Sequence, residues 1–343
     1  MIPVKLISKK KEIYPVGPGL DRYLRRFNRS ARLSINYDDL LSYSDCIALY
    51  DRNGEDTLWS SLSYSPSERR DIDRGLLELY AWMRAEGDLS ILHNLKVDRI
   101  DLCLYGNTKP LRIRIANRLN DNFEYYYIKR TDASRIYGLE LEHILSPNRI
   151  SFLYYGGTLV EDHIYGIPGD VFLHYFFRNP DLNKVRLAKE FVKFNERCFL
   201  RLLGDMHCAN FVVDITMDFE MNFYRIRGID FDQQSYEGRK KIYLPQFFKE
   251  NHPYVDLVLK TLSEESIEQY RKEERSLIHR RVKSAAPRLN RLLDLMEKDP
   301  VAPEANVKSL AKALADHHGD DRFLRCTSMG ALVRTSLGTL EKS

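Results

Sequence analysis

The feature of this chain that most limits its fold is a pair of short polar runs close together in the sequence. The first reads Gly204-Asp205-Met206-His207-Cys208-Ala209-Asn210, and the second reads Gly228-Ile229-Asp230-Phe231-Asp232. An acid, then an amide, then a second acid after an apolar stretch is the set of groups that transfers a phosphoryl group from a magnesium-bound nucleotide. The runs therefore predict Asp205 as a catalytic residue and Asn210 and Asp230 as magnesium ligands.

The residues between the two runs predict a β-hairpin. Apolar and β-branched residues at 211–215 and 223–229 indicate two strands, and the polar stretch between them indicates a turn. In an antiparallel pair, the start of one strand lies beside the end of the other, with Cα atoms about 5 Å apart. With the centre of the hairpin near Glu220, we expect Asn210 and Asp230 to face each other and to share one metal ion.

Composition places the chain among globular proteins. The chain is 43% hydrophobic and 11% aromatic, which favours a buried core. Its 343 residues are enough for about two folding units. We expect no membrane span, since no apolar stretch reaches about eighteen residues, and a cytoplasmic location, since the N-terminus lacks a secretory pattern. Five cysteines without C-x-x-C spacing indicate reduced thiols. A net charge of +4 in scattered clusters predicts no nucleic-acid partner.

Hydrophobic patterning divides the chain into three expected segments. Residues 1–96 are expected to form a helical N-terminal extension, with a capping box at Ser65. Residues 97–168 are expected to form a small antiparallel sheet with one helix, from strands at 97–105, 111–116 and 123–130, a helix at 133–145 and a hairpin at 149–155 and 158–164. Residues 169–343 are expected to be mostly helical, with long helices at 185–203, 264–281 and 288–298. The predicted fold class is α+β.

A small sheet with one helix, then a helical part carrying Gly-Asp-x-His-x-x-Asn and Ile-Asp-Phe-Asp, resembles the protein-kinase-like superfamily. The closer likeness is to its aminoglycoside phosphotransferase, choline kinase and lipopolysaccharide-sugar kinase branches. This resemblance, over 97–300, implies a two-lobed, ATP- and Mg²⁺-dependent phosphotransferase. It implies that Asp205 aligns the acceptor hydroxyl, that His207 braces the catalytic loop, and that Asn210 and Asp230 bind Mg²⁺. Asp232, where protein kinases have glycine, is either an added ligand or a strand-end acid.

The resemblance also implies a lysine that contacts the nucleotide phosphates and an acid that pairs with it. Lys129 continues a row of aromatic residues on one face of the third predicted strand, where its side chain can reach into a cleft or lie at the surface. Arg130 points to the opposite face. On the following helix Glu140 falls within the apolar sector, where an acid requires a partner, and Glu142 points away. We therefore expect a nucleotide-binding pair of Lys129 and Glu140.

Three functions fit these residues. The first is transfer of the γ-phosphoryl group of ATP to a hydroxyl of a small molecule, sugar or lipid-linked sugar, which the complete set of Asp205, Asn210 and Asp230 favours. The second is a pseudokinase-like module that binds a nucleotide or partner without turnover, favoured because only Gly106-Asn107-Thr108 stands where a glycine-rich phosphate loop is expected. The third is a two-metal phosphoesterase, whose further ligands would come from the cluster His317-His318-Gly319-Asp320-Asp321.

Overall fold

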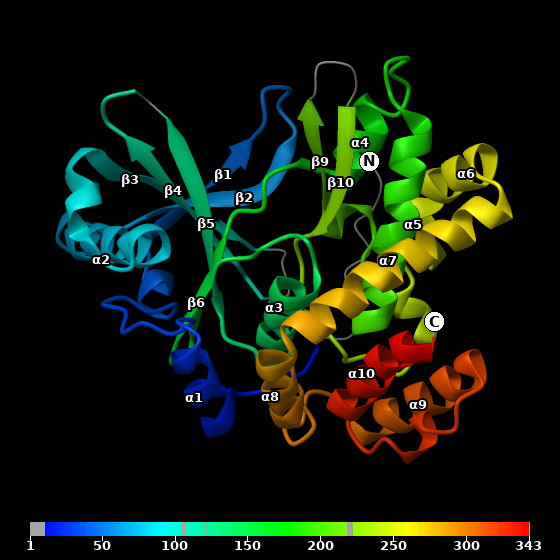
Figure 1. Cartoon of the computed structure of the whole chain (residues 1–343). Helices are drawn as coiled ribbons and strands as arrows, with labels where there is room; N and C mark the ends of the chain where they lie inside the picture. Colours follow the sequence, from blue (N-terminus) through cyan, green and yellow to red (C-terminus); the bar gives the residue numbers. More distant parts are fainter. Residues whose placement is uncertain (1–10, 105–107, 121, 218–221, 343) are drawn as a thin grey trace. The chain divides into compact units, whose positions relative to one another are not determined.

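The computed structural model of the chain describes residues 11–104, 108–120, 122–217 and 222–342. Contacts between residues divide the chain into two units. Unit 1 consists of Met1–Thr131 and Ser151–His163, and unit 2 of Asp132–Ile150 and Ile164–Ser343. Unit 1 is dominated by an antiparallel sheet and unit 2 by helices, so the α+β class is confirmed (Figure 1). Among the described residues, no helix combines the length and the apolar character that crossing a membrane requires.

Unit 1 is built around a seven-stranded antiparallel sheet in the order β1-β2-β3-β4-β5-β7-β6. Its strands are β1 (Asp45–Tyr50), β2 (Asp56–Ser63), β3 (Leu95–Cys103), β4 (Leu111–Asn117), β5 (Phe123–Arg130), β6 (Phe152–Tyr155) and β7 (Thr158–Asp162). The unit also contains helices α1 (Pro18–Arg26) and α2 (Pro66–Ala85). Residues of α2 such as Leu76 share a core with Ile113 and Ile128 of the sheet, and the capping box at Ser65 is present. The strands predicted from 97 to 164 are confirmed.

The expected helical extension over 1–96 is wrong, because β1 and β2 belong to the same sheet as the later strands. Trp59 of β2 pairs with Cys103 of β3, which joins the first hairpin to the rest. The side chains of β1 are mostly exposed, so its sequence lacks the alternation of apolar and polar residues that marks a half-buried strand. The three boundaries between the units, after residues 131, 150 and 163, differ from the expected divisions after residues 96 and 168.

Unit 2 contains most of the helices and a small second sheet. The helices are α3 (Ala133–Leu145), α4 (Gly169–Tyr175), α5 (Lys184–Arg201), α6 (His252–Thr261), α7 (Glu264–Ser284), α8 (Ala286–Met296), α9 (Glu304–His318) and α10 (Met329–Gly338). The sheet has the order β10-β9-β8, from β8 (Ile167–Pro168), β9 (Phe211–Met217) and β10 (Asn222–Gly228). Helix α5 contacts α6, α7, α10 and β10, so it is the central helix of the unit (Figure 1). The long helices predicted in this region are confirmed.

Helix α3 belongs to unit 2 and not to the sheet, which corrects the expectation of a small lobe that contains both. All of its residues except His143 are buried. A helix buried on every side carries no amphipathic signal, so the prediction that Glu142 points away from the core is also wrong. Glu142 is only 3% exposed, and its carboxylate pairs with Arg201 at the end of α5.

The Glu142–Arg201 pair gives a first prediction about stability. Both side chains are almost fully buried, so removing one leaves the other charge without its partner. We expect Glu142→Ala to lower the free energy of unfolding by about 3–5 kcal/mol. Lys308→Ala, which breaks the exposed pair of Lys308 with Glu304, should leave that free energy almost unchanged. Denaturant titration of both variants measures the difference, and equal effects would contradict the assignment.

Candidate active site

Strands β9 and β10 form the hairpin that the sequence predicts, but the register differs by one residue. Phe211 lies opposite Gly228, and the backbone N–H of Ile229 donates to the carbonyl oxygen of Asn210 at 3.0 Å. Asp230 is therefore one residue beyond the position that faces Asn210, which corrects the predicted direct pairing. The predicted centre, Glu220, lies outside the described residues. Asn210 and Asp230 nevertheless leave the hairpin at the same end.

Asp205 lies in a tightly constrained loop between α5 and β9. Its backbone adopts the left-handed conformation, with φ of 62°, a region that few residues other than glycine, asparagine and aspartate adopt. The preceding residue is glycine, and a Cβ atom there would lie 2.9 Å from Cγ2 of Ile242 and 3.0 Å from the carbonyl oxygen of Gln233, so a larger residue would force these neighbours to shift. The N–H of Asp205 donates to the carbonyl oxygen of Ile242 at 3.1 Å. The surrounding chain thus holds Asp205 in this left-handed conformation.

Asn210 and His207 close this loop from its other end. The side-chain Nδ2 of Asn210 donates to the carbonyl oxygen of Asp205 at 2.8 Å, and its Oδ1 accepts no hydrogen bond from the described part of the chain. The backbone N–H of His207 donates to the same Asp205 oxygen at 3.0 Å. The ring Nδ1 of His207 faces the N–H of Ala209 at 3.3 Å. His207 therefore orders the loop, and Asn210 presents an unoccupied oxygen donor.

Asp230 and Asp232 share a buried arginine from α3. The side chain of Arg135 is 2% exposed, and its Nη2 lies 2.8 Å from Asp230 Oδ1. Its Nε donates to Asp232 Oδ1 at 2.5 Å, and the N–H of Asp232 donates to Asp230 Oδ1 at 3.1 Å. The sequence analysis missed Arg135. The one available signal was a permanent charge at the start of a helix that is otherwise largely apolar.

The environment of Asp205 raises the pKa of its carboxyl group toward neutral pH. Burial raises the pKa of Asp205 to about 6, His207 acts to lower this pKa, and the carboxylates of Asp230, Glu237 and Glu250 act to raise it. The contribution of Asp230 means that the two acids lie within electrostatic reach of each other. A carboxyl group with a pKa near 6 ionises close to the pH at which a general base is most effective.

The side chains around Asp205 fit a hard divalent cation such as Mg²⁺. The amide oxygen of Asn210 and the carboxylate of Asp230 are ligands of the kind that Mg²⁺ binds. When all groups are ionised, the three carboxylates of Asp205, Asp230 and Asp232 and the guanidinium of Arg135 have a net charge of −2. One divalent cation would balance this charge. The donor set therefore suits the predicted role of Asn210 and Asp230.

A two-metal phosphoesterase fits the structure less well. Within the described ranges, no group of three or more His, Cys, Asp or Glu side chains is arranged to hold a metal ion. Two residues of the proposed downstream cluster, His317 and His318, end helix α9 and pack against the ring of Phe199. His317 is exposed and His318 is half-buried, so both lie at the surface end of α9 against Phe199, and no metal-binding arrangement within the described ranges includes them.

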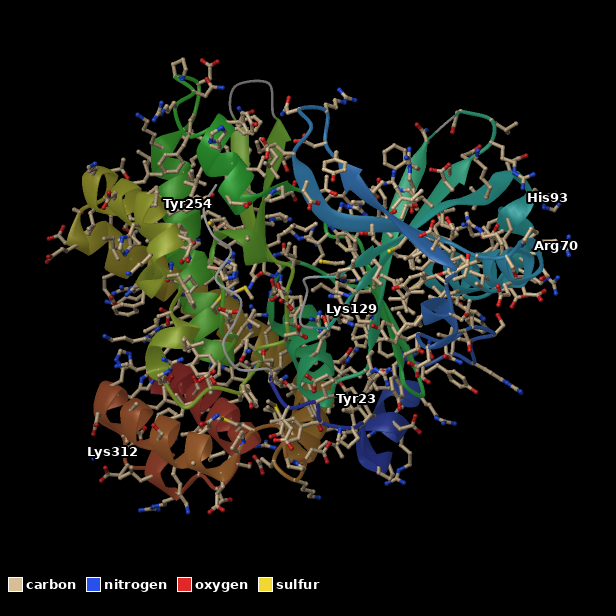
Figure 2. All side chains as sticks on the ribbon, turned by 180° about the vertical axis from the view of Figure 1, so that it is seen from behind. Tyr23, Arg70, His93, Lys129, Tyr254 and Lys312 are labelled. Atoms are coloured by element: carbon tan, nitrogen blue, oxygen red, sulfur yellow. The ribbon has the colours of Figure 1, made fainter. Side chains whose placement is uncertain are left out.

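Lys129 and Glu140 each have an ion-pair partner within their own unit. Lys129, labelled in Figure 2, lies on the predicted face of β5, and its Nζ is 2.8 Å from Oε2 of the buried Glu161 on β7. Glu140 is fully buried, and its Oε2 lies 2.7 Å from Nη2 of Arg288. The sequence analysis missed both partners, because they come from distant elements. The predicted pair of Lys129 with Glu140 would join the two units, and it stays a prediction.

Two other features bear on a ligand site. Of the expected phosphate loop, Gly106 and Asn107 lie outside the described residues.

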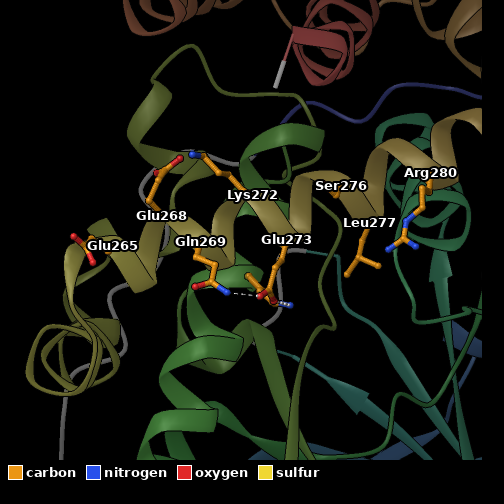
Figure 3. A pocket seen from close by; sticks show the side chains of 9 residues that line it. Glu265, Glu268, Gln269, Lys272, Glu273, Ser276, Leu277 and Arg280 are labelled. Carbon is orange, nitrogen blue, oxygen red and sulfur yellow. Dashed lines mark hydrogen bonds and ion pairs between the residues drawn. The ribbon is translucent and has the colours of Figure 1, made fainter.

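A groove of about 920 Å³ follows α7, with Gln269, Glu273 and Lys193 among its lining residues (Figure 3). Charges of both signs line this groove, and Lys193 Nζ lies 2.9 Å from Glu273 Oε2. None of the predicted site residues lines it, so we take the groove as a solvated helix face.

Comparison with known proteins adds no assignment. No protein-family model matches this chain, and no curated protein matches it significantly. The resemblance to the protein-kinase-like superfamily therefore stays an expectation from the motif residues.

The raised pKa of Asp205 predicts a pH-dependent stability in metal-free buffer. A carboxyl group whose pKa is higher in the folded state stabilises the fold most below its unfolded pKa, and this contribution is lost as pH rises through the folded pKa. The shift from 3.8 to about 6 corresponds to about 3 kcal/mol. We therefore expect Asp205→Asn to be more stable than the wild type by up to about 3 kcal/mol at pH 7 and by little near pH 4.

Denaturant unfolding in the presence of EDTA, repeated from pH 4 to pH 7, measures this difference. Asp88→Asn is a control of opposite sign, since a backbone hydrogen bond from Ser90 lowers the pKa of the exposed Asp88. A difference between Asp205→Asn and the wild type that stayed constant over the whole range would contradict the raised pKa.

Proposed function

We propose that this chain is an ATP- and Mg²⁺-dependent phosphotransferase that acts on a hydroxyl of a small molecule, sugar or lipid-linked sugar. In this proposal, units 1 and 2 correspond to the nucleotide-binding and catalytic lobes of a protein-kinase-like fold. The observation that supports it most is the arrangement of Asp205, Asn210 and Asp230. One loop and one hairpin bring these three residues close together, and the pKa of Asp205 is raised toward neutrality.

Each residue then has a distinct role. Asp205 would align the acceptor hydroxyl and take its proton while the new bond from oxygen to the γ-phosphorus forms and the bond to the ADP oxygen breaks. Asn210 and Asp230 would hold Mg²⁺, which when bound neutralises charge on the nucleotide phosphates. His207 keeps the loop ordered through its contacts with Asp205 and Ala209. Catalysis would come mainly from positioning and charge neutralisation.

Turnover tests the proposal directly. Release of ADP from Mg-ATP is measured across a panel of sugars, amino alcohols and lipid-linked sugars, with wild type and Asp205→Asn side by side. We expect Asp205→Asn to lower turnover by about 10²- to 10⁴-fold, as for loss of a general base. Asparagine keeps the size of the side chain and tolerates the left-handed backbone. Asp181→Asn, at an exposed position of unit 2, is the control and should retain full turnover.

The pH profile adds a second readout to the same experiment. Wild-type kcat/KM should rise with pH as Asp205 ionises, with an apparent pKa at or below about 6 because a bound cation favours the carboxylate. Turnover that is unchanged in Asp205→Asn would contradict the assignment of the base.

Lys129 is tested separately through nucleotide affinity. If its ammonium contacts the phosphates, Lys129→Met removes a charged hydrogen bond worth about 1.5–3 kcal/mol and weakens binding of an ATP analogue about 10- to 100-fold. Arg130→Met is a matched control, because Arg130 is the adjacent cation on the opposite face of β5 and pairs with Asp38. Calorimetric titration gives both affinities. An equal loss in the two variants would show that Lys129 has no specific role.

A pseudokinase-like binding module is the second candidate, and one observation favours it. The charges predicted to bind the metal and the phosphates already have protein partners, since Asp230 pairs with Arg135 and Lys129 pairs with Glu161. A module of this kind would bind Mg-ATP without releasing ADP in the presence of any acceptor. ADP release that falls in the Asp205→Asn variant would identify the enzyme, whereas nucleotide binding with no ADP release in either the wild type or this variant would identify the binding module.

A further inference from the structure

Arg135 occupies a position that the proposed function does not explain. Its guanidinium is buried and lies against both Asp230 and Asp232. An arginine side chain is permanently charged, and its planar group can bond two carboxylates at once. Arg135 therefore acts as a fixed positive charge directly beside a predicted metal ligand.

The helix that carries Arg135 is anchored to the segment that carries the two acids. Ser134 Oγ donates to the carbonyl oxygen of Gln234 at 2.9 Å. At Gly138 the two segments approach so closely that a Cβ atom would lie 3.2 Å from Cβ of Phe231. Asp132 caps the helix by accepting a hydrogen bond from the N–H of Ser134 at 3.1 Å. Arg135 cannot leave Asp230 by a movement of α3 alone without breaking these contacts.

Protein kinases place two magnesium ions at the acid and the amide that correspond to Asp230 and Asn210. In this chain a guanidinium already neutralises part of that charge, and it holds Asp232 as well. The three acids exceed Arg135 by two charges, so these side chains balance one divalent cation, and a second ion would have to be balanced by the nucleotide phosphates alone. A second ion would have to bind beside Arg135 at short range, where like charges repel.

We propose that the guanidinium of Arg135 takes the place of a second divalent cation, so that the nucleotide complex of this protein binds a single metal ion. This inference rests on the proposed function. It makes Arg135 a positioning residue, because the guanidinium holds the Asp230 carboxylate on one side and leaves the amide oxygen of Asn210 as the further ligand.

Counting bound Mn²⁺, a spectroscopic substitute for Mg²⁺, tests the inference without turnover. The full-length protein is saturated with a non-hydrolysable ATP analogue and titrated with Mn²⁺, and free Mn²⁺ is followed by electron paramagnetic resonance. We expect one bound Mn²⁺ per complex in the wild type and in Arg135→Lys, which keeps the charge. In Arg135→Met we expect a second Mn²⁺ that binds at least about 10-fold more tightly than any second ion in the wild type.

Arg197→Met is the matched control. Arg197 is also a buried arginine of unit 2 that pairs with two acids, Glu190 and Glu274, but it lies on α5, outside the catalytic loop. Its replacement removes the same chemistry elsewhere, so the count should stay at one. A second Mn²⁺ in Arg197→Met as well would overturn the inference, because the effect would then be a general loss of positive charge.

The number of Mn²⁺ ions bound by the wild-type complex tests the inference even if Arg135→Met does not fold. Two ions of comparable affinity in the wild-type complex would overturn the inference while leaving the proposed phosphotransferase function intact. A single ion in a well-folded Arg135→Met would also overturn it. If the wild type binds neither the analogue nor Mn²⁺, the proposed function itself fails, so the two failures are distinguishable.

Discussion

The geometry of the site depends on the hydrogen bond from the Asn210 side chain to the Asp205 carbonyl oxygen. This bond fixes the left-handed Asp205, and the backbone of Asn210 continues into the hairpin through Ile229. One residue thus joins the catalytic loop to the segment that carries Asp230. Contacts from outside this stretch add to it, since the N–H of Asp205 donates to the carbonyl oxygen of Ile242 and Asp230 pairs with Arg135 of α3. The placement of the three predicted site residues therefore follows from a short stretch of chain together with two distant parts of unit 2.

Buried charges determine where helix α3 lies within unit 2. Arg135 pairs with the two acids after β10, Glu140 with Arg288, and Glu142 with Arg201. Such pairs add little net stability compared with apolar packing, but each is costly to break, so together they disfavour other positions of the helix. The pairs link the acidic segment to α8 and α5. Asp230, the predicted metal ligand, is thereby preorganised, since the orientation of its carboxylate is set by protein contacts.

The sequence predicts the elements that depend on hydrophobic periodicity and short-range capping, and not those that depend on contacts between distant segments. Periodicity predicts the β9–β10 hairpin, and short-range capping chemistry predicts the helix that begins after Ser65. Strand β1 was missed because most of its side chains are exposed, and the register at Asn210 was wrong by one residue because the turn length was judged from composition. The partners of Lys129 and Glu140 could not be predicted. The choice of partner for a buried charge is made by packing between elements that are far apart in the sequence.

The raised pKa of Asp205 reduces the stability of the protein near neutral pH. Asparagine at this position would remove that cost and keep the left-handed backbone, which aspartate and asparagine both adopt. A binding module without turnover gains nothing from a carboxyl group here. A raised pKa at one acid beside a predicted metal ligand is an expected property of a general base. The arrangement therefore favours the enzyme over the scaffold, even though Arg135 already neutralises part of the charge that a metal ion would meet.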